Sequence, residues 1–336
     1  MKKKSIIAAI VVLSILIAGF CIRRYVLSPF SGESSVWVYV PKGTDRTALA
    51  DTLRSSLGNR TAARVMALYR VFANDSSDAR GAYLVKPGDR AKDIARRLVN
   101  RRQTPVRVTF NNIRTREQLS ARVASAMEFT PADFEAAMVA VLPGAGFKQE
   151  EFMAAFLPDT YEFYWTTPAE DVVTRLLDER NKFWNDDRRA AAATLGLSPV
   201  KVAVLCSIAE EETNNRDERA TVARLYLNRV RVGMKLQADP TVKYAVGDFS
   251  LRRILGKHLA VDSPYNTYKV NGLPPGPIRM PERRTMEDFL NAPDNNYLYM
   301  CAKEDFSGRH NFTRDFSVHK ANALRYQKAL NARGIK

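Results

Sequence analysis

A long apolar run near the N-terminus is the first pattern along the chain. Residues 6–22 are almost entirely apolar, with three lysines before the run and two arginines after it. Seventeen residues is short for a transmembrane helix, but longer than the apolar core of a typical cleaved signal peptide. No small-x-small cleavage site follows, and Phe20 precedes Cys21 where a lipoprotein would have a small residue. We therefore expect an uncleaved membrane anchor.

The charges beside this run favour one orientation. They are nearly balanced, but a short, lysine-rich N-terminus normally stays inside the cell. Residues 1–27 are therefore expected to form a cytoplasmic tip and a single-pass transmembrane anchor in the inner (plasma) membrane. Residues 28–35, SPFSGESS, have the composition of a linker. The rest of the chain is then expected on the periplasmic, extracytoplasmic side.

A strand, a Pro-x-Gly turn and a short helix follow the linker and then recur. The pattern occupies residues 36–53 and again 83–99, and a third copy at 106–123 has lost the Pro and Gly. Units of this size resemble LysM modules, which bind N-acetylglucosamine polymers. We assign residues 36–125 to a small LysM-like α+β module or modules. An ordinary α+β spacer domain is the alternative.

Further along, helical patterns alternate with an aromatic segment. Residues 130–142, 149–157 and 171–184 have the spacing of helices, the first with a Thr cap and a proline at its first position. Between them, residues 157–167 read LPDTYEFYWTT, with four aromatic side chains beside an acid. Such a segment could form the wall of a sugar-binding cleft, since aromatic rings stack on pyranose faces. Buried hinge aromatics are the other interpretation.

The next helix carries the strongest chemical signal. Ser198 and Pro199 have the residue types of an N-cap and a first helical position, and residues 200–209 are apolar almost all round. Three consecutive glutamates, Glu210, Glu211 and Glu212, then end the helix. Carboxylates at a helix C-terminus oppose the helix dipole, which favours cations there. Such a departure from local rules is typical of a functional site.

Helical geometry selects one glutamate of the three. Glu212 lies within about 40° of the stripe formed by Leu205 and Ile208, whereas Glu210 points roughly opposite. A carboxyl against apolar side chains, with acidic neighbours, should have a raised pKa, as a general acid at neutral pH requires. The alternative is a solvated acidic helix end that pairs with nearby arginines, Arg216, Arg219 and Arg224.

The block around this helix resembles the endolytic murein transglycosylases, the MltG or YceG-like family. In that family the second glutamate of an E-x-E pair is catalytic, which maps to Glu212, with Glu210 as the fallback. This chain has Cys206 and Glu211 where the family has alanine and lysine, which makes the local field more negative. The segments that carry the resemblance are SIAEEET (207–213), ERATVARLYLNRVRVGMKLQADPTVKYAVG (218–247), SPYNTYKVNGLPPGPI (263–278), YLYMCA (297–302) and HNFT (310–313).

The resemblance implies an α+β fold in which residues 126–336 form a mixed α/β catalytic domain. It implies a lyase that cleaves the MurNAc-β-1,4-GlcNAc bond within nascent peptidoglycan strands, leaves 1,6-anhydro-MurNAc ends and ends strand elongation. One carboxylate suffices, because the attacking oxygen belongs to the substrate, whereas hydrolases usually need two. The residues expected to contact substrate, each with a turn or capping role as its alternative, are Glu210, Asn228, Gln237, Asp239, Thr241, Tyr265, Asn266, Thr267, Tyr268, Leu273, Pro274, His310 and Phe312.

Charge and composition narrow the partners. The net charge of +16 predicts a polyanionic partner, but the basic residues are interleaved with acids, which argues against nucleic acid. The three histidines and the two cysteines outside the anchor lack metal-ligand spacing, so we expect neither a metal nor a cofactor. Cys206 and Cys301 could be paired or free. The expected partners are peptidoglycan strands, the plasma membrane and peptidoglycan synthases. The alternative function is a non-catalytic peptidoglycan-binding membrane protein with LysM-like modules.

Overall fold

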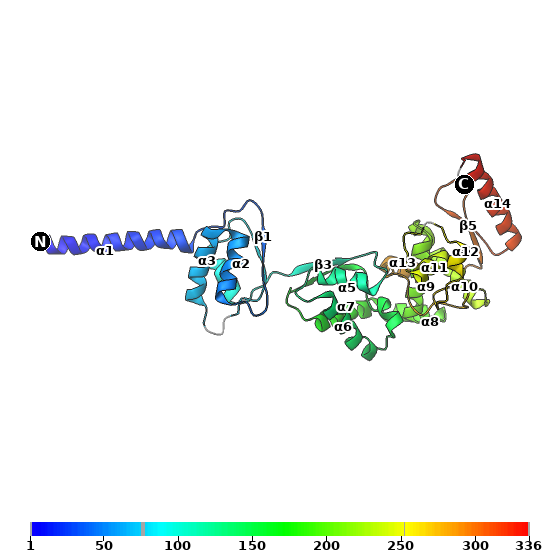
Figure 1. Ribbon diagram of the computed structural model, residues 1–336, viewed down its shortest axis with the longest axis horizontal. Coiled ribbons are helices and arrows are strands. Elements are labelled where there is room, and N and C mark those ends of the chain that lie inside the picture. Colours follow the sequence, from blue (N-terminus) through cyan, green and yellow to red (C-terminus); the bar gives the residue numbers. More distant parts are fainter. Residues whose placement is uncertain (1, 75–77, 252, 335–336) are drawn as a thin grey trace. The chain divides into compact units, whose positions relative to one another are not determined.

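The computed structural model describes residues 2–74, 78–251 and 253–334. The chain divides into two compact units, which are coloured by sequence in Figure 1. Unit 1 contains Met1–Val108, Ala126–Phe129 and Tyr161–Pro168, and unit 2 contains Thr109–Ser125, Thr130–Thr160 and Ala169–Lys336. The described strands pair into three two-stranded sheets among many helices. The fold is therefore a mixture of helices and small sheets.

The N-terminal apolar run forms a helix, as predicted. Helix α1 (Lys2–Cys21) continues into a π-helical turn (Ile22–Val26). Residues Ile6–Val26 have a mean hydropathy of 2.7, and none of this segment is buried in the protein. Its 21 residues give it the length and apolar composition to cross a membrane.

Unit 1 joins two of the predicted strand–turn–helix copies in one module. Strands β1 (Val36–Val40) and β2 (Gly81–Val85) pair antiparallel, with Val38 opposite Tyr83. The two copies are therefore halves of one structure rather than two separate repeats. The third copy differs, because β3 (Val106–Phe110) pairs with β4 (Asp159–Phe163).

Three helices complete the module. They are α2 (Arg46–Leu57), α3 (Asn59–Phe72) and α4 (Ala91–Val99). Helices α2 and α3 lie side by side (Figure 1), and α4 packs against α3. Helix α3 was not predicted from the sequence.

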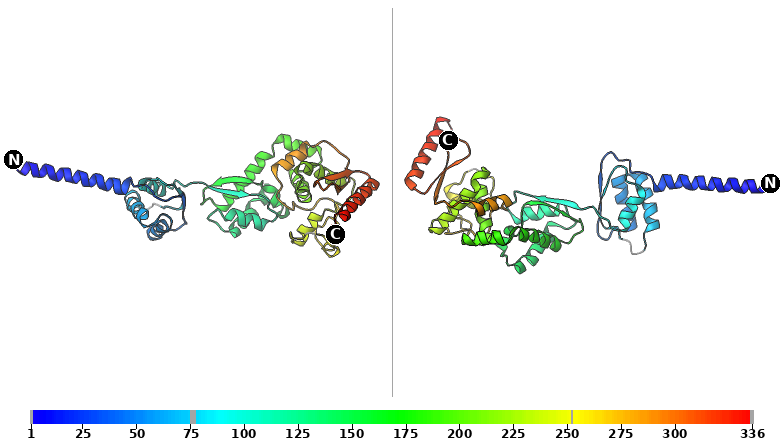
Figure 2. Two further views of the ribbon diagram at one scale, coloured as in Figure 1. Left: turned by 90° about the horizontal axis from the view of Figure 1, so that it is seen from above. Right: turned by 180° about the vertical axis from the view of Figure 1, so that it is seen from behind.

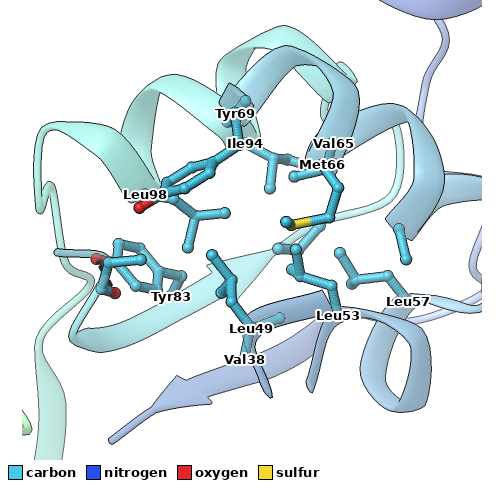
Figure 3. Packing of buried hydrophobic residues seen from close by; sticks show 14 of the residues in the cluster. Val38, Leu49, Leu53, Leu57, Val65, Met66, Tyr69, Tyr83, Ile94 and Leu98 are labelled. Atoms are coloured by element: carbon cyan, nitrogen blue, oxygen red, sulfur yellow. Dashed lines mark hydrogen bonds between the residues drawn. The ribbon is translucent and has the colours of Figure 1, made fainter. Parts of the chain in front are cut away.

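The core of unit 1 lies between these helices and the β1–β2 sheet. Leu53 of α2, Val65 of α3 and Leu98 of α4 are fully buried and point toward the same interior (Figure 3). On β1, Val38 and Val40 face this core, whereas Tyr39 is 41% exposed on the opposite face. This alternation is that of a strand with one buried face.

Unit 2 is mostly helical, and two further views of it are given in Figure 2. Its C-terminal helix lies beside the β5–β6 hairpin. Its elements are α5 (Arg116–Ala124), α6 (Pro131–Val141), the 3-10 helices η2 (Pro143–Ala145) and η3 (Gln149–Ala155), α7 (Ala169–Phe183), α8 (Asp186–Thr194), α9 (Pro199–Glu212), α10 (Arg216–Arg231), α11 (Asp239–Val246), α12 (Gly256–Leu259), α13 (Arg283–Asn291), β5 (Tyr299–Ala302), β6 (His310–Thr313) and α14 (Phe316–Ala332).

The two helix starts for which the sequence indicated a capping residue were predicted correctly. Thr130 caps α6 through a capping box with Asp133, and Ser198 caps α9. The predicted helix at 149–157 is a 3-10 helix that ends two residues earlier. Asn185 caps helix α8, which the sequence analysis did not predict, by accepting from the backbone N–H of Arg188.

The aromatic segment has two environments. Tyr161 and Phe163 are buried on β4, whereas Tyr164 is 54% exposed. Trp165 contacts Tyr39, with ring centroids 5.3 Å apart. Part of the segment is therefore core and part surface.

The two cysteines outside the N-terminal helix do not form a disulfide bond. Cys206 and Cys301 are both free thiols.

Candidate active site

The candidate site is built on the C-terminal end of α9. The Ser198 hydroxyl accepts from the backbone of Lys201 at 3.3 Å, and residues 202–210 are buried on every side of the helix. The helix packs against α10, α11 and α13. It thus holds the three glutamates at a rigid position, and their different surroundings give them different chemistry.

Glu210 is enclosed and paired. Its side chain is fully buried, with Oε2 lying 3.1 Å from Nε of Arg279. Its Oε1 accepts from the backbone N–H of Glu282 at 2.8 Å, and Arg219 lies 3.9 Å away. Burial raises the pKa of Glu210, and these partners oppose the rise. This environment favours a structural role for Glu210.

Glu211 is held even more completely. Arg114 approaches it as a fork, with Nε donating to Oε1 and Nη2 donating to Oε2, both at 2.9 Å. Arg279 donates to Oε1 at 3.0 Å. Bidentate arginine–carboxylate pairs are strong and geometrically specific. Arg279 therefore bridges the first two glutamates, and Arg114 clamps the second.

Glu212 has a different environment. No lysine or arginine among the described residues forms an ion pair with it, and its Oε2 is buried without a hydrogen-bond partner in that part of the chain. The hydroxyl of Tyr226 on α10 hydrogen-bonds to the carboxylate. Burial, helped by the charge of Asp239, raises the pKa of Glu212 to about 7, although the Tyr226 bond and the charges of Arg229 and Lys243 lower it.

The residues that tune Glu212 are themselves fixed. Asp239, at the start of α11, accepts a hydrogen bond from the Tyr268 hydroxyl at 2.7 Å. Arg229 donates to the carbonyls of Leu298 at 2.7 Å and Leu236 at 2.6 Å. At these contacts Arg229 donates to backbone oxygens and not to a carboxylate. No ion pair therefore neutralises its positive charge there.

Several of the predicted contacts stabilise the loop after α10. Thr267 accepts from the backbone of Ala238 at 3.1 Å, and its hydroxyl lies 2.8 Å from that of Thr241. Asn266 donates to two carbonyls of the preceding turn. Thr241, Asn266 and Thr267 are all fully buried. Their geometry favours the turn-stabilising alternative, and they position Asp239 and Tyr268.

The other predicted contacts are spread over the unit. Asn228 donates to the carbonyls of Asn295 and Tyr297 at 3.0 and 3.1 Å, and so fixes the segment before β5. Gln237 is exposed in a left-handed conformation, with φ 49°. Tyr265 packs on Tyr244, with centroids 4.7 Å apart.

Four predicted substrate contacts, Leu273 and Pro274 in one loop and His310 and Phe312 on β6, lie elsewhere in unit 2. Leu273 and Pro274 line a hollow of about 640 Å³ beside the start of α9. On β6, the His310 side chain contacts Glu218 through Nδ1 at 2.9 Å, and Phe312 stacks on Tyr297 at 5.6 Å. The His310–Glu218 contact connects the hairpin to α10.

Sequence reasoning missed Tyr226 and Arg229 as partners of Glu212. They stand three residues apart on α10, a spacing that places side chains on one helix face. The spacing could be read from the sequence. The sequence did not show that this face of α10 lies opposite the end of α9. Within the described residues, no three His, Cys, Asp or Glu side chains come together as metal ligands would. Chemically, the arrangement offers one proton-transfer group with a near-neutral pKa beside a fixed cation.

The YceG-like family profile matches residues 38–325, which is most of the chain. The chain belongs to the YceG-like family. A crystal structure of a yceG-like protein from Listeria monocytogenes is similar, with a TM-score of 0.55 and 26% sequence identity over 86% of this chain and 99% of that one. The resemblance seen in the motifs around α9 is therefore confirmed at the level of the family and its fold.

Relatives of this YceG-like chain carry a functional name. It is 34% identical over 175 residues to a protein of Bacillus subtilis (strain 168) named "Endolytic murein transglycosylase", a match that covers 52% of this chain and 48% of the relative. A Streptococcus pneumoniae (D39) protein of the same name is 27% identical over 163 residues, covering 47% of this chain and 29% of the relative. The chain spans about half the length, or less, of these relatives.

Proposed function

We propose that this protein is an endolytic peptidoglycan lytic transglycosylase with Glu212 as its acid and base. It cleaves the MurNAc-β-1,4-GlcNAc bond within nascent glycan strands. The observation that carries the proposal is the contrast along the end of α9, where Glu210 and Glu211 are held by arginines and Glu212 is not. The names of the Bacillus and Streptococcus relatives support the same chemistry.

The reaction uses the near-neutral pKa of Glu212. With a pKa of about 7, about half of the carboxyl groups carry a proton at neutral pH. Glu212 gives this proton to the glycosidic oxygen as the bond from the muramoyl C1 breaks. The carboxylate then takes the proton of the muramoyl 6-hydroxyl while that oxygen bonds to C1. The product is a 1,6-anhydro end, the proton returns to Glu212, and no water is consumed.

The neighbours of Glu212 assist this cycle. The Tyr226 hydroxyl donates to the carboxylate and stabilises it between the two proton transfers. Arg229 favours the charged form at longer range, whereas Asp239 favours the protonated form. The opposing influences keep the pKa close to neutral, where one group serves as acid and then as base.

The N-terminal segment places this chemistry at the membrane. We propose that α1 anchors the protein in the plasma membrane with a single pass, and that both units lie on the extracytoplasmic side. Cleavage there ends strand elongation close to the synthases that extend the strand, which are the expected partners. A protease that cannot cross the membrane should digest unit 2 in intact spheroplasts. Protection of unit 2 would contradict this orientation.

Unit 1 is proposed to hold the glycan in the manner of a LysM module. Its β1–β2 sheet exposes an aromatic face, on which Trp37 and Tyr39 stack with centroids 5.7 Å apart and Trp165 adjoins Tyr39. Aromatic rings of this kind bind the apolar faces of pyranose rings. The anchored module then keeps a strand near the catalytic unit.

The experiment is product analysis with a matched pair of variants. Purified full-length protein in detergent micelles is incubated with uncrosslinked glycan strands, and the strand ends are identified by mass spectrometry. Wild type should yield anhydro ends, and Glu212→Gln should lower the rate by at least about 100-fold, the usual contribution of general acid–base catalysis. Glu211→Gln makes the same chemical change one residue away and should retain chemistry in its folded fraction.

Other outcomes would identify other functions. Reducing ends without anhydro ends would show a hydrolase, which requires a second carboxylate, and Asp239 is the acid whose charge acts on Glu212. A folded wild type that binds peptidoglycan but leaves strands intact would support the alternative, a non-catalytic wall-binding membrane protein.

A further inference from the structure

A polar hollow of about 690 Å³ lies in unit 2 beside the end of α9. Its volume falls within the range of small-ligand sites in proteins. The wall combines four arginines with three asparagines and two threonines. Its lining residues are Thr109, Phe110, Asn111, Asn112, Pro158, Asp159, Thr160, Asn214, Arg216, Arg279, Glu282, Arg283 and Arg284.

The arginines of this wall differ in how firmly carboxylates hold them. Arg279 pairs with Glu210 and Glu211, which lie outside the lining, and Nη2 of Arg283 lies 3.1 Å from Oδ2 of Asp159. Glu282 is shared by Arg216 and Arg219. The charge that an anion could reach is therefore that of Arg216 and Arg284.

Two of the arginines hold their carboxylate partners loosely. The Arg216 side chain is 64% exposed and lies 3.7 Å from Glu282. The Arg284 side chain is 69% exposed and lies 3.4 Å from Asp288, which is outside the wall. A planar guanidinium presents a fork of donors that matches a carboxylate. These two side chains can turn toward an incoming anion at little cost in lost contacts.

The hollow lies at the end of the helix that carries the proposed catalytic group, on the side of Glu210. Asn214, in its wall, follows Glu212 by two residues, so their Cα atoms are at most about 7.6 Å apart. Arg279, also in the wall, contacts Glu210 and Glu211 directly. A flexible chain attached to the sugar on which Glu212 acts would therefore have only the end of α9 to pass before it reached the hollow.

We propose that the hollow binds carboxylates of the peptide carried by the same glycan strand. The inference rests on the proposed function. In peptidoglycan the stem peptide is attached to the muramoyl residue, which is the sugar whose C1–O bond is cleaved. Along the covalent structure of the strand, a carboxylate-bearing peptide is thus the anionic group closest to the bond on which Glu212 is proposed to act. The arginine wall would make the enzyme prefer strands that carry peptides over bare strands.

Three substrates separate charge from size. The first is uncrosslinked strands with intact peptides. The second is the same strands after an amidase has removed the peptides, which leaves only the lactyl carboxylate on each muramoyl residue. The third has the peptide carboxyls converted to amides. Full-length wild type should cleave the first with about tenfold higher kcat/KM than either of the others. The combined variant Arg216→Ala/Arg284→Ala should bring this ratio toward one, mainly through KM.

The control is an arginine of similar exposure elsewhere in unit 2. Arg175 on α7 is 60% exposed and pairs with Glu179 at 2.8 Å, and Arg175→Ala should leave the substrate ratio at its wild-type value. A wild type that cleaves none of the three substrates would overturn the proposed function itself. Equal cleavage of all three, or a preference that survives the double variant, would overturn the peptide-binding inference while leaving the catalytic proposal intact.

Discussion

Replacement of Glu212 by glutamine should stabilise the protein at alkaline pH while abolishing its activity. The carboxyl is partly buried, and burial with the charge of Asp239 raises its pKa to about 7 from the ordinary 4.5. Glutamine has the same shape and no charge. It therefore removes the cost of holding a buried carboxylate and keeps the packing at the end of α9.

The sign and size of the effect follow from proton linkage. Below pH 4.5 both the folded and unfolded states hold the proton, so Glu212 costs nothing. Between pH 4.5 and 7 the folded state holds a proton that the unfolded state has lost, and stability falls as pH rises. Above pH 7 the full cost remains, which is about 3 kcal/mol for a rise from 4.5 to about 7 at 1.36 kcal/mol per pH unit. Glu212→Gln should recover this amount at pH 8 and almost none at pH 4.

Urea unfolding of full-length protein between pH 4 and pH 8 measures the difference. Trp184 is buried in unit 2, whereas Trp37 and Trp165 belong to unit 1. A Trp37→Phe/Trp165→Phe background therefore makes fluorescence report on unit 2. Glu210 also has a raised pKa, but it is present in both proteins and cancels from the difference. Parallel stability curves for wild type and Glu212→Gln would refute the reasoning.

Three further predictions concern neighbouring contacts. Tyr226→Phe removes a hydrogen bond that lowers the pKa of Glu212, so the alkaline limb of the kcat profile should move to higher pH. Asp239→Asn removes a charge that raises this pKa, so the same limb should move to lower pH. A shift in the same direction for both variants would contradict the assignment. Arg279→Ala leaves Glu210 buried with weaker partners and should cost about 3–5 kcal/mol in urea unfolding, with a loss below about 1 kcal/mol counting against it. In a Glu212→Gln background, Tyr39→Ala should weaken sedimentation with peptidoglycan several-fold, whereas Tyr164→Ala, an exposed aromatic of the same unit, should not.

Local signals predicted local structure well. Thr130 and Ser198 mark helix starts because a side-chain oxygen there accepts from an exposed backbone N–H, and this requires no knowledge of the rest of the fold. The residues of α9 itself are apolar on almost every side, and this pattern correctly predicted that the helix is buried. The angular argument also separated Glu212 from Glu210, since the two lie on different sides of α9 and only Glu210 reaches Arg279.

Long-range partners could not be predicted in this way. Arg114 is 97 positions from Glu211, and Arg279 is 68 positions from it. Periodicity carries no information about such distances. The sequence suggested Arg216, Arg219 and Arg224 as partners of the glutamates. Of these, Arg219 lies 3.9 Å from Glu210, whereas Arg216 pairs with Glu282 and Arg224 with Asp294. The same limit explains β1 and β2, which were seen as parts of separate copies although they pair across 45 residues in one sheet.

The burial of α9 has a consequence for how the protein loses activity on heating. Residues 202–210 are enclosed by other helices, so we expect the backbone amides just before Glu212 to exchange with solvent only after large-scale opening of the helices around them. The proposed catalytic group would thus lie on one of the last segments to unfold. Heat inactivation should therefore coincide with the melting of unit 2, without an earlier stage in which a folded protein has already lost its site.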